Sequence, residues 1–256
     1  MWRAAIGLTA NTLAQSAMLT HTQIHNLGDF VMIEADALRA DLCSVCHDMW
    51  HHGWVAANDG NVSALLDNGL ILCTPSGISK RDITPEMLIV VDKSGNLVEG
   101  SRKPSTELPM HLRCYQERPD VRAVVHAHPP MSTSFAVADV PLDDYAMIET
   151  ILTLGSVPIA PYATPGTDEV PDSIAPFLHN HDAILMRAHG ALTLGKDLKT
   201  AFYRMETLEH FAKITLFSKL LGGAKDLSRD QIDELIERRE SFYHLPGRHP
   251  GYEKLH

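Results

Sequence analysis

A short apolar run near the middle of the chain ends in two histidines one residue apart, Val124-Val125-His126-Ala127-His128. Such a run predicts a buried strand, and side chains at positions i and i+2 of a strand point to the same face. His126 and His128 can therefore reach one metal ion together. The pair alone is equally compatible with two solvated imidazoles at the end of an edge strand, so the rest of the chain has to decide.

Two further residues favour the metal site. Glu107 comes shortly before the pair, at the start of a predicted helix, and a second apolar run ends in His189. Among the fifteen histidines of the chain, only His126, His128 and His189 end apolar strands, where side chains can converge at one edge of a sheet. Three neutral imidazoles suit Zn²⁺ and leave an open coordination position, so the sequence predicts a zinc site.

The remaining histidines are interpreted differently. His179 and His181 repeat the His-x-His spacing, but they fall in a polar turn between a helix and a strand, and we leave them out of the site. His111 is four residues after Glu107 and shares its helix face. It is interpreted as a structural residue or as a neighbour of the site.

The order of the predicted elements indicates a layered α/β domain. Helices are predicted over residues 29–52, about 105–116, 132–138, 170–180, 198–221 and 230–239, with Ser105 or Thr106 capping the second and Ser228 the last. Strands are predicted over residues 62–66, 70–74, 89–91, 97–98, 123–128, 157–160, 183–189 and 192–194. These strands form a central, mostly antiparallel sheet in one domain, residues 29–256, and residues 1–28 are expected to be a flexible N-terminal extension.

Charge and composition exclude several function classes. The formal net charge is −10, so nonspecific binding to nucleic acid is not expected. No apolar run is long enough to span a bilayer, and we expect a cytoplasmic protein. The four cysteines are scattered, and Cys43 and Cys46 form a CxxC without a second one to complete a zinc site, so buried free thiols are expected.

Three small polar clusters resemble anion cradles, because glycines let backbone N–H groups approach an anion and hydroxyl and amide groups donate the rest. The clusters are Gly60-Asn61, Ser76-Gly77 and Ser105-Thr106. Ordinary turn chemistry explains each of them as well. None matches a phosphate-binding or dinucleotide-binding glycine pattern, so a nucleotide cofactor is not expected.

Six motifs in order resemble the class II aldolase/adducin family, and most closely its L-fuculose-phosphate aldolase-like members. They are Gly60-Asn61-Val62-Ser63, Thr74-Pro75-Ser76-Gly77-Ile78, Glu99-Gly100 with Lys103 to Glu107, Val125 to His128, Ala160 to Thr164, and Ala188-His189-Gly190. The resemblance covers residues 35 to 221. It implies a single three-layer α/β/α domain with a mostly antiparallel sheet, assembled as a homotetramer with active sites between subunits.

The resemblance also implies roles for individual residues. His126, His128 and His189 correspond to the ligands of one Zn²⁺, or another divalent transition metal, per subunit. Glu107 corresponds to the catalytic acid/base, which can also approach the metal. The three polar clusters correspond to the cradle for a substrate phosphate. Tyr145 is similar to a tyrosine that enters the neighbouring subunit's site and protonates the aldehyde side.

The implied reaction is cleavage of a ketose 1-phosphate to dihydroxyacetone phosphate and an aldehyde, through a zinc-stabilised enediolate. Pro165 stands where the fuculose-phosphate enzymes carry phenylalanine, so the aldehyde half is left open. Alternatives are decarboxylation or dehydration of a sugar-acid phosphate or methylthioribulose phosphate at the same metal site, an unphosphorylated substrate, and a non-catalytic adducin-like module. No lysine at a strand end supports Schiff-base chemistry.

Overall fold

The computed structural model describes residues 21–245 and His249, and the chain divides into two units, residues up to Leu38 and residues from Arg39 on. Helix α1 (His21–His51) crosses that boundary, and its residues 21–38 are the part of the first unit that the structure describes. The predicted start of this helix at Asp29 is wrong. Gly28 lies inside the helix, because one glycine costs only about 1 kcal/mol there and does not have to end it. Most of the predicted N-terminal extension lies outside the described residues.

An eight-stranded sheet forms the centre of the second unit, in the order β4-β3-β2-β1-β5-β8-β7-β6. Its strands are β1 (Asn61–Leu65), β2 (Ile71–Cys73), β3 (Ile89–Val91), β4 (Leu97–Glu99), β5 (Ala123–Ala127), β6 (Ile159–Ala160), β7 (Ala183–Met186) and β8 (Gly190–Gly195). Every neighbouring pair is antiparallel except β6 and β7. The predicted mostly antiparallel sheet is confirmed.

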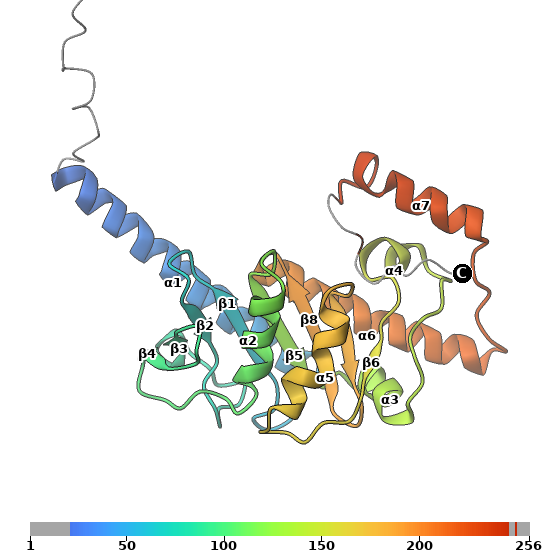
Figure 1. The fold of residues 1–256 in the computed structure, drawn as a ribbon, viewed down its shortest axis with the longest axis horizontal. Coiled ribbons are helices and arrows are strands. Elements are labelled where there is room, and N and C mark those ends of the chain that lie inside the picture. Colours follow the sequence, from blue (N-terminus) through green and yellow to red (C-terminus); the bar gives the residue numbers. More distant parts are fainter. Residues whose placement is uncertain (1–20, 246–248, 250–256) are drawn as a thin grey trace, which may run out of the picture. The chain divides into compact units, whose positions relative to one another are not determined.

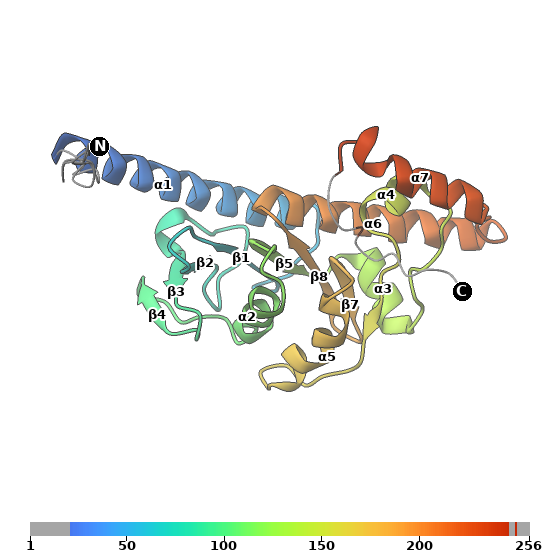
Figure 2. The same cartoon turned by 45° about the horizontal axis from the view of Figure 1, so that its top comes forward.

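Helices cover both faces of this sheet (Figures 1 and 2). Helices α2 (Leu108–Glu117) and α5 (Glu169–Leu178) lie on one face, where Met110 and Ile174 pack against Val124 and Leu192 of the central strands. Helix α6 (Leu198–Leu220) and the part of α1 from Arg39 on lie on the other face, and α3 (Pro130–Ala138) packs beside α6. The layered α/β fold expected from the sequence is therefore present.

Two helices near the C-terminal end form a smaller apolar cluster. Helix α4 (Ile148–Thr153) packs against α7 (Arg229–Ser241), with Ile151 and Ile232 buried between them. Ser228 caps α7, as predicted, in a reciprocal capping box. Helix α4 was not predicted, because six residues are too few to show a helical period. The one-turn 3-10 helix η1 (Pro85–Met87) precedes β3.

The burial of the cysteines and the character of the helices bear on two further predictions from the sequence. All four cysteines are free and buried, as expected. Burial raises the pKa of the Cys46 thiol to about 12, so this cysteine is protonated and unreactive. Among the described helices none combines the length and apolar character needed to cross a bilayer.

Candidate metal centre

The three predicted ligand histidines lie at one edge of the sheet. Asn61, the first residue of β1, pairs with His126 near the end of β5, and His126 pairs on its other side with Leu192 of β8. His189 lies in the tight turn that joins β7 to β8, directly before Gly190. The sheet register therefore brings strand ends distant in sequence to the same place.

The imidazoles face one another across a small space. The nearest ligand atoms of His126, His128 and His189 all lie within 4.8 Å of each other, and Nε2 of His128 is 3.2 Å from Nε2 of His126. Glu107 closes the group: its Oε1 is 2.9 Å from Nε2 of His189, and its Oε2 is 3.5 Å from Nε2 of His126. The structure thus brings together all four residues that the sequence assigned to a metal.

The protonation of the histidines suits a metal. Nδ1 of His126 donates to the carbonyl oxygen of Ala191 at 2.9 Å, so the lone pair of the neutral ring is on Nε2, toward the other histidines. Burial lowers the pKa of His126 to about 3, although Glu107 acts in the opposite direction. Burial and the nearby His189 lower the pKa of His128 as well. A neutral imidazole with a free lone pair is the form of histidine that binds a divalent cation, and burial favours that form at His126 and His128.

Gly190 is required for this close packing. A Cβ atom on Gly190 would lie 2.5 Å from Cδ2 of His128 and 2.6 Å from the carbonyl oxygen of Ala127. Both distances are below van der Waals contact, so any side chain here would displace either His128 or the strand beneath it. The packing around His128 therefore excludes any side chain at position 190.

Glu107 lies at the N-terminal end of α2, as predicted, but it occupies the N-cap position itself instead of Ser105 or Thr106. The predicted cap was one or two residues early, because Ser105 accepts from the backbone N–H of Glu107 and makes a turn before the helix. Burial alone would raise the pKa of Glu107. The adjacent His126 and His189 and the hydrogen bond from Asn61 outweigh it, and they hold the pKa well below its usual range.

A buried chain of hydrogen bonds supports Glu107 from behind. Nδ2 of Asn61 donates to Oε2 of Glu107 at 2.5 Å, and Oδ1 of Asn61 accepts from Nε2 of His111 at 2.5 Å. Nδ1 of His111 lies 2.7 Å from Oγ of Ser63, which is 2.7 Å from the hydroxyl of Tyr115. Every donor in this chain meets an acceptor, and the orientation of the Asn61 amide is fixed. His111 does not join the histidine cluster and is placed one residue behind it.

The three predicted anion-cradle clusters lie beside this chain. Gly60 has a positive φ of 72°, and a Cβ there would lie 2.9 Å from the carbonyl oxygen of His126, so the turn before β1 needs glycine. The backbone N–H of Ser76 donates to the carbonyl oxygen of Lys103 at 2.9 Å, which holds the loop after β2 against the segment before α2. Gly77 is open to its surroundings, and Thr106 is exposed.

Tyr145 is placed apart from the metal cluster. Its side chain is buried in the apolar cluster between α4 and α7, with Ile151 and Ile232, and its backbone N–H donates to Asp226 at 3.0 Å. The role that the resemblance gives it belongs to a neighbouring subunit's site and stays a prediction.

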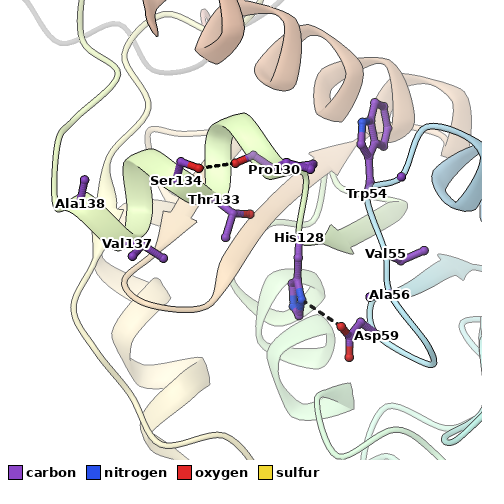
Figure 3. A pocket seen from close by; sticks show the side chains of 11 residues that line it. Trp54, Val55, Ala56, Asp59, His128, Pro130, Thr133, Ser134, Val137 and Ala138 are labelled. Atoms are coloured by element: carbon purple, nitrogen blue, oxygen red, sulfur yellow. Dashed lines mark hydrogen bonds and ion pairs between the residues drawn. The ribbon is translucent and has the colours of Figure 1, made fainter.

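A cavity of about 510 Å³ opens beside His128 (Figure 3). Its walls come from residues 53–59 and from helix α3, and they are largely apolar, including Trp54 and Val137. Asp59 borders both the cavity and the metal cluster, because its Oδ2 is 3.6 Å from Nδ1 of His128. The sequence predicts only a turn at Asp59, because nothing in Asn-Asp-Gly-Asn distinguishes a turn from a site.

Glu209 of α6 was also missed. Its carboxylate accepts from the backbone N–H groups of Met131 and Ser132, at 2.9 and 2.8 Å, and from the hydroxyl of Ser132 at 3.0 Å. It therefore caps α3, which begins two residues after His128. A charged residue on a long amphipathic helix carries no sequence signal for such a contact.

The sequence of the chain is similar to those of known proteins. Residues 40–216 match the family model of the class II aldolase and adducin N-terminal domain. A 5-deoxy-D-ribulose 1-phosphate aldolase from Bacillus thuringiensis is 31% identical over 206 residues, covering 80% of this chain and 96% of the relative. A 3-oxo-tetronate 4-phosphate decarboxylase from Pectobacterium atrosepticum is 31% identical over 218 residues, covering 82% and 98%.

The fold is shared with solved structures too. An L-fuculose 1-phosphate aldolase superposes with a TM-score of 0.73 at 32% identity, covering 79% of this chain and 95% of that one. With a family model matched over most of its length, the chain belongs to the class II aldolase and adducin family, and it is similar to the L-fuculose-phosphate aldolases within it.

Proposed function

We propose that this protein is a metal-dependent lyase that cleaves a ketose 1-phosphate to dihydroxyacetone phosphate and an aldehyde. The observation that carries the proposal is the convergence of His126, His128 and His189 with the carboxylate of Glu107, which is 2.9 Å from His189. A half-buried carboxylate that faces three converging imidazoles is typical of a functional site, because ionisable groups gather in this way more often at active sites than in structural packing.

The donor set fits a divalent transition metal, and Zn²⁺ is the ion we propose. His126, His128 and His189 would hold it, with Glu107 close enough to join them before substrate binds. The bound ion would supply Lewis acidity beside the carbonyl and hydroxyl oxygens of the substrate.

Glu107 would move the proton at the carbon that becomes the nucleophile when the carbon–carbon bond breaks. Glu107 is a carboxylate at neutral pH, which is the form that accepts a proton. Asn61 holds one of its oxygens, so the carboxylate presents a fixed direction.

The two halves of the substrate would lie on different sides of this group. Gly60, Asn61, Ser76, Gly77, Ser105 and Thr106 would bind the phosphate through backbone N–H, hydroxyl and amide groups. The cavity beside His128 is large enough for the aldehyde half, and its apolar walls favour a short, deoxygenated tail. Tyr145 of a neighbouring subunit would donate a proton there, which requires its hydroxyl to leave the apolar cluster in which the side chain is buried. The same role requires the homotetramer that we also propose. We expect the protein in the cytoplasm.

The second candidate is decarboxylation of a sugar-acid phosphate at the same centre. The name of the Pectobacterium relative favours it, and that relative is as similar to this chain as the ketose-phosphate aldolase is. Both reactions leave negative charge on the same substrate oxygens, so the metal centre alone does not choose between them. A Schiff-base reaction is disfavoured, because the buried lysine near the centre, Lys80, donates its Nζ to two backbone carbonyls and is only 2% exposed.

Metal content is the first test. The purified protein should hold about one transition metal per chain, and His189→Ala, which removes a partly exposed ligand, should lose it with the fold retained by circular dichroism. His179→Ala, an exposed histidine of the polar turn, is the matched control and should keep the metal. A wild-type protein that takes up only a small fraction of a metal per chain would leave the adducin-like, non-catalytic alternative.

A substrate panel is the second test. The metal-loaded protein is incubated with ketose 1-phosphates and with 3-oxo-4-phosphosugar acids, and dihydroxyacetone phosphate and CO₂ are detected by coupled assays. Release of dihydroxyacetone phosphate supports the proposed aldolase reaction, whereas release of CO₂ with no dihydroxyacetone phosphate supports the second candidate. Light scattering of the same sample reports whether it is a tetramer.

A further inference from the structure

Lys80 is a buried cation that the reaction above does not use. It lies three residues after Gly77, and its Nζ donates to the carbonyl oxygens of Ile78 at 3.1 Å and of Asn58 at 3.2 Å. In the part of the chain that the structure describes, no carboxylate lies within ion-pair distance of Nζ. Burying an ammonium group without a counter-ion is costly, so its presence beside a cluster of functional groups calls for a role.

The two carbonyls that Lys80 binds adjoin two different segments of the anion cradle. Asn58 comes two residues before Gly60, and Ile78 directly follows Gly77. The turn that contains Asn58 holds two residues with positive φ, Ala57 at 47° and Gly60 at 72°. A left-handed alanine costs of order 1 kcal/mol, so this turn depends on contacts from outside it.

We propose that Lys80 is a positioning residue of the anion cradle, tying its first two segments together and giving the bound phosphate a buried positive charge. This inference rests on the phosphorylated substrate of the proposed function. The six cradle residues are all uncharged, and the chain carries a net charge of −10. Lys103, which adjoins the cradle, is exposed, so its charge is screened more strongly by solvent than that of Lys80.

The surroundings of Lys80 agree with an anion nearby. Burial lowers the pKa of Lys80, while the carboxylates of Asp59 and Glu107 raise it. A phosphate in the cradle would add a further negative charge and would favour the ammonium form. The positive charge on Lys80 is therefore favoured most strongly when the phosphate is bound.

Two variants separate the charge from the hydrogen bonds. Lys80→Met keeps the length of the apolar stem and removes both charge and donors, whereas Lys80→Gln removes the charge and keeps a donor. Lys93→Met removes an exposed lysine from the turn between β3 and β4 and is the matched control. Binding of inorganic phosphate to the metal-loaded proteins is measured by titration calorimetry, after the metal content of each is shown to be equal.

We expect Lys80→Met to bind phosphate about tenfold more weakly than wild type, Lys80→Gln to lie between them, and Lys93→Met to match wild type. In turnover, KM for the phosphorylated substrate should rise in Lys80→Met with kcat nearly unchanged. Wild-type affinity in Lys80→Met, or equal losses for phosphate and for an unphosphorylated substrate analogue, would overturn the assignment.

A measurement on the wild-type protein covers the case in which Lys80→Met does not fold. The ¹⁵Nζ resonance of Lys80 should shift when inorganic phosphate is added, and that of Lys93 should not; an unmoved Lys80 resonance refutes the proposal. The two proposals fail separately. A protein that binds phosphate through Lys80 but cleaves no member of the panel refutes the proposed reaction alone, whereas ketose 1-phosphate cleavage unaffected by Lys80→Met refutes only the role of Lys80.

Discussion

The amide of Asn61 donates to the carboxylate of Glu107 across 2.5 Å, and the same amide accepts from His111 on its other side. One strand residue therefore links a charged group at the metal centre to a buried neutral histidine behind it. Because Asn61 is also the register partner of His126, the sheet itself determines how far Glu107 stands from the histidines. The position of Glu107 is set by backbone pairing as much as by its own helix.

Replacing Glu107 by Gln should remove most turnover while leaving the fold intact. An amide can still accept from Asn61 through its oxygen and donate to His189 through its nitrogen, so the local contacts survive. It does not accept a proton at neutral pH, and we expect kcat to fall by about 10²–10⁴-fold. Steady-state kinetics with the best substrate of the panel measures this, with metal content and thermal unfolding as checks on the protein.

An uncharged mutant with wild-type turnover would contradict the acid/base role of Glu107. Glu117→Gln, an exposed carboxylate at the other end of α2, is the matched control and should be indistinguishable from wild type.

Replacing Gly190 by Ala should weaken metal binding at the centre. The added Cβ would overlap Cδ2 of His128 and the carbonyl oxygen of Ala127, and relief of such overpacking typically costs about 1–3 kcal/mol and moves one of the two groups. We expect at least a tenfold loss of metal affinity in a protein that still folds. Metal analysis after dialysis against a weak chelator measures this. Gly166→Ala is the control: the exposed loop has open space for a Cβ, and the positive φ of 78° makes the substitution cost about 1 kcal/mol, but the protein should keep its metal.

The sequence predicts the residues of this centre better than the contacts that hold them. His126, His128 and His189 stand out because each lies at the end of an apolar run, and period-two alternation places the first two on one face. The structure places His126 inside β5 and His189 in the turn after β7, not at the end of the predicted strand. The register that brings Asn61 beside His126 depends on pairings between strands about sixty residues apart in sequence, which no local pattern encodes.

The sequence does not predict the contacts made by residues of types that are common in ordinary turns. Lys80 and Asp59 lie in turns whose composition is explained by turn chemistry alone, and their burial or proximity to His128 follows only from the packing of three separate segments. Helix α1 begins earlier than predicted because a glycine costs a helix only about 1 kcal/mol, so Gly28 alone does not determine the residue at which the helix starts.

The stability of the metal-free protein should fall between pH 6.5 and pH 4, partly through His111. Burial lowers the pKa of His111 from 6.5 to about 4, although Glu107 acts in the opposite direction. In that window the unfolded chain binds the proton and the folded protein does not. The free energy of unfolding therefore decreases as the pH falls, and the loss is complete near pH 4. A shift of this size corresponds to about 3 kcal/mol.

Urea denaturation at a series of pH values, at one protein concentration and with chelator present, measures this dependence. His111→Gln keeps a donor toward Asn61 but does not titrate, so its stability should fall less steeply over the same range. If wild type and His111→Gln lose stability in parallel, the buried imidazole is not the group responsible.

Glu209 is expected to stabilise the metal centre without touching it. Its carboxylate caps α3 from α6, and α3 starts two residues after His128, so the cap restrains the segment that carries this ligand. Glu209→Gln keeps the shape but turns an amide donor toward a backbone donor, which costs about 1–2 kcal/mol. The melting temperature should fall by a few degrees. Metal affinity should fall by about tenfold, as for other residues that orient ligands.

Glu206→Gln, exposed on the same helix, controls for the loss of charge. A lower melting temperature with unchanged metal affinity would show that Glu209 supports α3 alone.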